Sequence, residues 1–68
     1  MDERALDEVR DELRRLADRL GDLAYDELRR AVSAGEGERP DAERRLARAR
    51  RAVERAISIL SSRGADGE

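Results

Sequence analysis

Residues 6–23, Leu-Asp-Glu-Val-Arg-Asp-Glu-Leu-Arg-Arg-Leu-Ala-Asp-Arg-Leu-Gly-Asp-Leu, carry the pattern that decides the fold. Large apolar residues recur there at alternating spacings of three and four. This is the heptad pattern of an amphipathic helix that packs along one seam. The seam has two rows, Leu6, Leu13 and Leu20 in one and Val9, Leu16 and Leu23 in the other.

The helical pattern extends in both directions from this stretch. Beyond Leu23 the next seam position is Glu27, and the apolar stripe continues through Ala24, Leu28 and Ala31. Such a shift moves a heptad pattern toward an eleven-residue repeat. The sequence therefore predicts one helix over 2–34. Gly21 leaves an alternative open, because glycine costs ~1 kcal/mol in a helix interior, and a break there would give three helices.

A turn and a second helix follow. Residues 35–39, Gly-Glu-Gly-Glu-Arg, have no periodicity, and Pro40 suits the first position of a helix. From there the apolar spacing predicts a helix over 40–62. Its two rows are Leu46, Val53 and Leu60 in one and Ala42, Ala49 and Ala56 in the other. We expect the alanine row to let the two helices approach closely.

These elements predict an all-α antiparallel helical hairpin, with residues 1–63 as a single domain and 64–68 as a disordered tail. The helix 2–34 is the longer one, so folding back over the turn should place Ser62 near Glu12 and leave Leu6 and Val9 without an internal partner. The thirteen large aliphatic residues make a small core. Such a core rarely supplies more than ~3–5 kcal/mol. Because the chain has no Cys and no His, self-association is the expected source of further stability.

Apolar residues outside the seams support a homodimer. Tyr25 and Val32 lie well away from the first seam, and Ala52 and Ile59 lie away from the second. Two hairpins packed as a four-helix bundle would cover such strips. The predicted oligomer interface is Leu6, Val9, Leu13, Tyr25, Val32, Ala52 and Ile59.

The charged residues are unevenly distributed. All fifteen basic residues are Arg, and the net charge is −2. Residues 44–55 hold six Arg and one Glu, which suggests three interpretations. The arginines could pair with the acidic first helix, Arg48 lying near Asp26 and Glu27; they could bind an acidic protein; or they could follow a phosphate backbone. The predicted surface for a polyanion or an acidic partner is Arg44, Arg48, Arg51 and Arg55.

Side chains for catalysis are scarce. The chain has no His, Cys or Lys, so its serines lack the usual bases. The carboxylates of Asp7, Glu8, Asp11 and Glu12 fit a solvated helix face better than a metal site, and we predict neither metal nor cofactor. Glu27 lies where the seam expects an apolar residue, and we interpret it as fixing register through an arginine, Arg48 or Arg44.

One family resemblance is confined to five residues. Leu-Asp-Glu-Val-Arg at 6–10 resembles part of the first helix of small chorismate mutases, all-α dimers that hold a dicarboxylate with arginines. The resemblance implies a small enzyme with an arginine pocket. The chain is short for the three helices of that family and lacks the Lys and Gln that those sites use, so no membership follows.

The sequence therefore favours a small non-enzymatic protein–protein interaction module, a regulator or assembly factor that acts as a homo-oligomer. The first alternative is a nucleic-acid-binding protein that uses residues 44–55, and the second is the small arginine-pocket enzyme. The N-terminus lacks the pattern of a signal peptide and no apolar run could cross a bilayer. We expect a cytoplasmic protein without a membrane partner.

Overall fold

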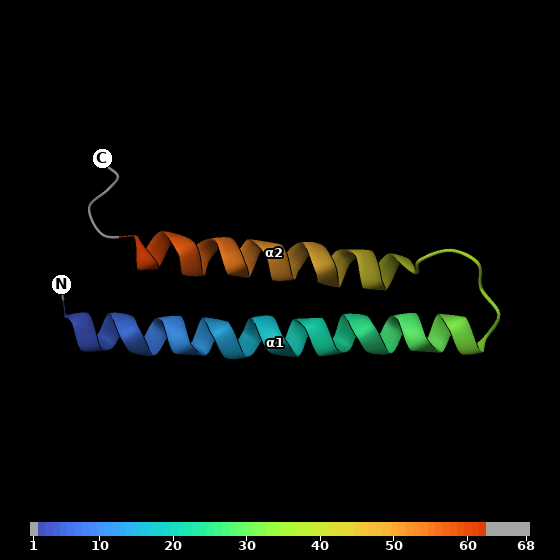
Figure 1. Cartoon of the computed structure of the whole chain (residues 1–68), viewed down its shortest axis with the longest axis horizontal. Coiled ribbons are helices and arrows are strands. Elements are labelled where there is room, and N and C mark those ends of the chain that lie inside the picture. Colours follow the sequence, from blue (N-terminus) through green and yellow to red (C-terminus); the bar gives the residue numbers. More distant parts are fainter. Residues whose placement is uncertain (1, 63–68) are drawn as a thin grey trace.

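Two helices account for nearly all of the structure. The computed structural model describes residues 2–62, with α1 at Glu3–Ser33 and α2 at Asp41–Ser61. The helices lie side by side and antiparallel (Figure 1). The predicted all-α hairpin is confirmed, and each predicted helix end differs from the observed one by a single residue. The predicted tail at 64–68 lies outside the described residues.

The first helix is continuous through its glycine, so the three-helix alternative is wrong. The Asp2 side chain caps α1 by accepting a hydrogen bond from the Arg4 backbone N–H at 2.9 Å, which satisfies one of the free donors at a helix start. A Cβ atom at Gly21 would lie 2.6 Å from Nη1 of Arg50. Gly21 therefore leaves room for the Arg50 guanidinium where α2 crosses it.

A glycine ends α1. Gly35 has a φ of +78°, in the left-handed region that L side chains rarely adopt. Its N–H donates to the carbonyl of Val32 at 3.0 Å, and the N–H of Glu36 donates to the carbonyl of Ala31 at 2.9 Å. These two bonds form a Schellman motif, which satisfies carbonyls at the helix end and turns the chain away from the helix axis.

We expect Gly35→Ala to destabilise the hairpin by about 1 kcal/mol, because a Cβ atom is strained at a positive φ. Gly37→Ala is the matched control, since Gly37 lies in the same turn with a φ outside that region and open space around its Cα. Urea unfolding of the two variants measures the difference. An equal loss of stability in both would contradict the assignment of Gly35 as the helix terminator.

The second helix begins after Pro40, whose missing N–H costs nothing at a helix start. Asp41 and Glu43 lie in its first turn, where carboxylates interact favourably with the helix dipole. At the other end, the N–H of Ser62 donates to the carbonyl of Ser58 at 3.1 Å. Arg10 Nη1 donates to the carbonyl of Leu60 at 3.1 Å, so the last turn of α2 lies level with Arg10.

The hairpin is a single layer with little interior. Its Cα extents are 50 × 22 × 10 Å, with a radius of gyration of 15.8 Å. A compact domain of this length would have a radius of gyration of about 11 Å. Among residues 2–62 the buried apolar residues are only Ala17, Ala24 and Ala31, and no large side chain is fully buried. The two helices therefore meet along one line of small residues.

This contact line corrects the predicted core. Leu16 and Leu23, expected between the helices, are 50% and 46% exposed, whereas Val9, expected to have no internal partner, is 43% exposed. Ala42 and Ala49 are also exposed, so the expectation that the α2 alanine row brings the helices together is wrong. The alanines that do so belong to α1. Each helix is rotated so that only one edge of its apolar seam reaches the other helix.

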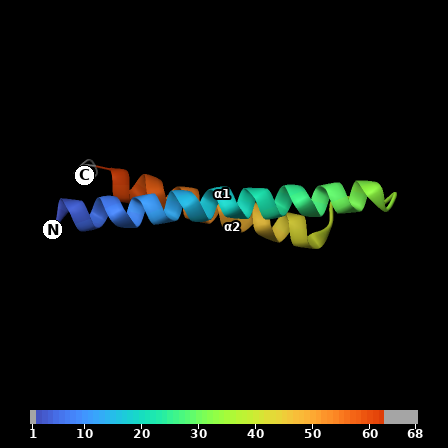
Figure 2. The same ribbon diagram turned by 90° about the horizontal axis from the view of Figure 1, so that it is seen from below.

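The ends of the helices also differ from expectation. Both ribbon views show α1 extending past α2 at the turn as well as at the termini (Figures 1 and 2). The extra length of α1 is thus divided between the two ends instead of being collected at its N-terminus. Of the two residues expected to have no internal partner, Leu6 is half-buried and Val9 is exposed.

Candidate interaction surface

One side of the hairpin carries both seams and is called the apolar face here. On each helix, one row of the seam is half-buried at the edge of the helix contact and the other row lies further out. The outer row on α1 is Val9, Leu16 and Leu23, and the outer row on α2 is Ala42, Ala49 and Ala56, of which Ala56 is half-buried. The half-buried rows are Leu6, Leu13 and Leu20 on α1 and Leu46, Val53 and Leu60 on α2.

A groove on the other side shows that the two outer rows share one face. Gly21 and Tyr25 of α1 line this groove together with Ala47 and Glu54 of α2. At about 100° per residue, the outer row of α1 lies on the opposite flank of the contact line from Gly21 and Tyr25. The outer row of α2 likewise lies opposite Ala47 and Glu54. Both rows therefore point to the side away from the groove.

The apolar face is large for a chain of this size. It extends from Leu6 to the level of Ala42, about 35 Å at 1.5 Å per residue. Two helices side by side are about 20 Å wide. The product, about 700 Å², is close to the ~800 Å² that each partner buries in a standard protein–protein interface.

The seven residues of the predicted oligomer interface do not share one surface. Leu6, Val9 and Leu13 belong to the apolar face. Tyr25 and Val32 lie on the groove side, 62% and 73% exposed, and the Arg29 guanidinium lies 5.9 Å from the Tyr25 ring centre. Ala52 and Ile59 are exposed on the side of α2 that faces away from α1. One flat interface cannot cover all three surfaces.

Two large apolar residues that the predicted interface did not include, Leu16 and Leu23, are also exposed. Their exposure follows from the rotation of α1. The signal that could have revealed it is the line of small residues at Ala17, Gly21, Ala24 and Ala31, because close helix contacts favour small side chains. This line runs beside the leucine seam and marks the side of α1 that meets α2.

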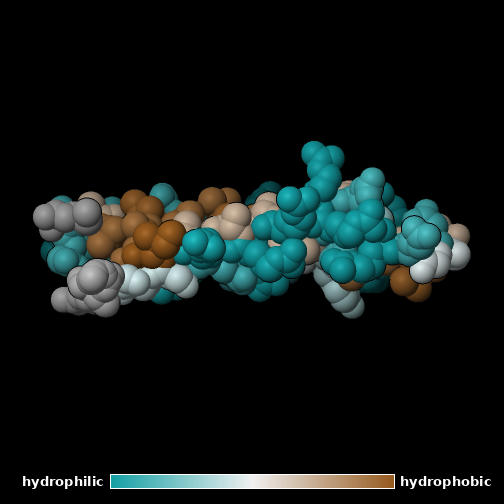
Figure 3. All heavy atoms as spheres, turned by 90° about the horizontal axis from the view of Figure 1, so that it is seen from above, coloured by the Kyte–Doolittle hydropathy of each residue, from teal (hydrophilic) through white to brown (hydrophobic). Residues whose placement is uncertain are grey.

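The four arginines of the predicted polyanion surface form one exposed stripe. Arg44, Arg48, Arg51 and Arg55 are spaced four, three and four residues apart on α2, which places them on one helix face. Figure 3, which looks onto α2, shows hydrophilic side chains over the half nearer the turn and hydrophobic ones toward the end with the termini. Arg44 pairs with Asp41 and donates to the carbonyl of Arg39 at 2.9 Å.

The ion pairs are local. All six ion pairs among residues 2–62 join residues three or four apart in the sequence, and none connects α1 with α2. The expected pairing of Arg48 with Asp26 or Glu27 inside the hairpin is therefore absent from the described part of the chain. Glu27 pairs instead with Arg30. The opposite charges of the two helices are not used to hold the hairpin together.

The turn holds a buried carboxylate. Glu43 is 5% exposed and accepts a hydrogen bond from Nε of Arg39 at 2.6 Å. This hydrogen bond is the main cause that lowers the pKa of Glu43, helped by the charges of Arg39, Arg44 and Arg51 and opposed by burial. Arg39 thereby ties the turn to the first turn of α2.

Because the pKa of Glu43 is lowered in the folded state, the free energy of unfolding depends on pH in the acidic range. A carboxyl with a lower pKa in the folded state stabilises the fold above its unfolded pKa, and this contribution is lost as the pH falls through the folded pKa. We expect Glu43→Gln to lower stability at neutral pH and to flatten the loss of stability toward about pH 2. Urea unfolding across this range measures it, with Glu38→Gln in the exposed turn as control. Equal acid sensitivity in Glu43→Gln and the unmodified chain would contradict the role of this pair.

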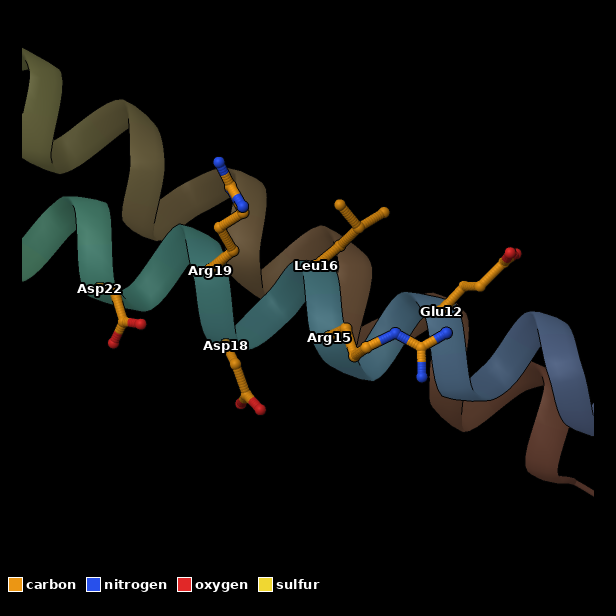
Figure 4. Close-up of a pocket in the computed structure, with 6 residues that line it drawn as sticks. All are labelled: Glu12, Arg15, Leu16, Asp18, Arg19 and Asp22. Carbon is orange, nitrogen blue, oxygen red and sulfur yellow. The ribbon is translucent and has the colours of Figure 1, made fainter.

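Two hollows lie on the described part of the surface. One of about 700 Å³ is lined by α1 alone, and its labelled side chains splay apart along the helix (Figure 4). The groove beside Gly21, about 590 Å³, holds Arg50 and Arg51 together with Glu43 and Glu54. Arg50 Nε pairs with Glu54 at 3.2 Å, so this groove has mixed charge and not the arginine-only lining that a dicarboxylate would favour.

Across 2–62, no group of three or more carboxylates is arranged to hold a metal ion. Neither α1 nor α2 is apolar over a stretch long enough to span a bilayer. Comparisons with protein-family models, with curated proteins and with solved structures each gave no match. The geometry of the apolar face is therefore the basis for a functional proposal.

Proposed function

We propose that this chain is a non-enzymatic protein–protein interaction module that associates with itself through the apolar face to form a four-helix bundle. The observation that carries the proposal is the exposure of Val9, Leu16 and Leu23 at heptad spacing. Heptad rows of large aliphatic residues are typical of helices that are covered on that side. In a bundle, seam rows point to the bundle centre and adjacent helices touch through the flanking residues.

The arrangement inside the hairpin supports this proposal. The flanking positions Ala17, Ala24 and Ala31 are the buried apolar residues of α1. Burying the exposed apolar face would contribute roughly 25 cal/mol for each Å² of apolar surface removed from water. The hairpin alone buries no large side chain completely among residues 2–62. Association therefore supplies most of the core that this chain can form.

Sedimentation equilibrium tests the proposal. We expect about twice the chain mass of 7.7 kDa at tens of micromolar protein, with the helical circular dichroism retained. We also expect the unfolding temperature to rise with protein concentration, because association stabilises the folded state by mass action. A single-chain mass together with full helicity and a concentration-independent unfolding temperature would refute the proposal.

The exposed arginine stripe supports a second candidate function, binding to the phosphate backbone of nucleic acid. Arg44, Arg48, Arg51 and Arg55 follow one helix face, and the last three form no ion pair among residues 2–62. The evenly spaced charge is also consistent with an acidic protein partner.

If the chain is a protein–protein interaction module, we expect it not to bind duplex DNA near physiological salt. The triple variant Arg44→Gln, Arg51→Gln and Arg55→Gln should then retain the fold, since exposed ion pairs contribute only ~0–1 kcal/mol each. If the stripe binds phosphates, each lost Arg should reduce the slope of log affinity against log salt by about one. Titration with duplex DNA at two salt concentrations separates the two functions. Micromolar binding that the triple variant abolishes would favour the nucleic-acid function.

A further inference from the structure

The proposed self-association does not specify which helix of the second copy lies on α1 and which lies on α2. The side chains on the surface of each helix favour one arrangement. Two hairpins can join their apolar faces about a twofold axis in two ways. If the axis is parallel to the helices, α1 of each copy covers α2 of the other. If the axis runs across the helices, α1 covers α1 and α2 covers α2. Neighbouring helices are antiparallel in both arrangements, so helix direction does not distinguish them.

The sizes of the side chains favour α1 on α2. The outer row of α1 is Val9, Leu16 and Leu23, whereas the outer row of α2 is all alanine. Facing layers fill space best when large side chains oppose small ones. An arrangement of α1 on α1 would place leucine against leucine on one side of the bundle and alanine against alanine on the other. The first contact would be crowded and the second would leave a gap.

The position of each residue along the helix axes, called its level here, determines which leucine of α1 faces which alanine of α2. Gly21 lies against Arg50, and Arg10 is bonded to Leu60. By continuation Leu23 lies about one residue from the level of Ala49, and Leu16 lies about one to two residues from the level of Ala56. An axis parallel to the helices keeps every residue at its own level. Leu23 then meets Ala49 of the second copy, and Leu16 meets Ala56 of the second copy.

The charges point to the same arrangement. Helix α1 has seven arginines and nine carboxylates, a net charge of −2, and α2 has six arginines and three carboxylates, a net charge of +3. Placing α1 on α1 would bring like net charges together on both sides of the bundle. Arg45 flanks the apolar face near the level of Asp26, and neither forms an ion pair among residues 2–62. Opposite charges are thus available between copies.

We propose that the second copy binds with its basic, alanine-lined α2 on the acidic, leucine-lined α1, about a twofold axis parallel to the helices. This inference rests on the proposed self-association. It predicts that the two α1 helices are parallel and face each other diagonally across the bundle. Every α1 residue then lies at the same axial level as its own counterpart in the second copy.

Spin-label distances test this arrangement directly. The chain has no Cys, so Arg4→Cys and Ser33→Cys each provide a single labelling site in an otherwise unlabelled protein. Both residues are exposed and lie near opposite ends of α1, on nearly the same side of the helix at about 100° per residue. Sedimentation of each labelled variant, compared with the unmodified chain, shows that the label leaves association unchanged.

The proposal predicts similar distances between the two labels of a dimer in both variants, about 20–35 Å, because neighbouring helix axes are 8–10 Å apart and the labels lie outside the bundle. In the arrangement with α1 on α1, the two labels of each variant lie near opposite ends of the bundle, about 40 Å or more apart. That result would overturn the proposed helix arrangement and leave the self-association intact. A label pair with no dipolar coupling in a chain that sediments as a monomer would instead refute the self-association, and the helix arrangement with it.

Discussion

Leu16→Glu should convert the proposed dimer into single hairpins. Leu16 is 50% exposed in one hairpin, and the apolar face would bury the remainder in the bundle. The variant loses this burial twice in a dimer and places two carboxylates where water is excluded. Together these effects amount to about 3 kcal/mol or more. We expect the dissociation constant to rise at least about 100-fold, measured by sedimentation equilibrium over a range of concentrations.

Val32→Glu is the matched control for this substitution. Val32 is also an apolar residue of α1 and is more exposed, at 73%, but it lies on the groove side of the hairpin. We expect this variant to associate like the unmodified chain. If Val32→Glu weakened association as strongly as Leu16→Glu, the groove side and not the apolar face would be the interface.

Ala24→Leu should force the two helices apart. Ala24 is 8% exposed at the middle of the contact line, so a larger side chain there would press against α2. Overpacking of this kind costs about 1–3 kcal/mol, a large fraction of the stability of so small a protein. Urea unfolding at one fixed protein concentration measures the change.

Ala52→Leu provides the comparison for Ala24→Leu. Ala52 is exposed on the side of α2 that faces away from α1, so the same substitution should change stability by no more than about 0.5 kcal/mol. Equal shifts of the unfolding midpoint would mean that the helices do not meet along Ala17, Ala24 and Ala31.

The sequence was sufficient to predict the two helices, the turn and the antiparallel hairpin. Spacings of three and four determine a helix and its apolar side, and Gly35 and Pro40 mark where one helix ends and the next begins. Gly21 was ambiguous because helix propensity alone does not show what lies beside a residue. The neighbour is Arg50, a tertiary contact that local sequence does not reveal.

The rotation of the helices was the feature that the sequence left undetermined. A heptad seam identifies the side of a helix that is covered, but not how many neighbours cover it. With one neighbour the whole seam would face that helix, and with three it would face the centre of a bundle. The seam predicts Leu16 and Leu23 in the hairpin contact because a single chain offers each helix only one neighbour. Their exposure in the structure corrects this assignment.

The contact line of three alanines has a consequence for how the protein persists in a cell. A lone hairpin closed over Ala17, Ala24 and Ala31 opens at little cost, and an open helix is readily cleaved by proteases, since cleavage follows the population of open chains. Newly made chains that find no partner would be removed, and paired chains would be spared. Under the proposed self-association, the amount of this protein would respond steeply to its rate of synthesis, because the survival of each copy would depend on another being present.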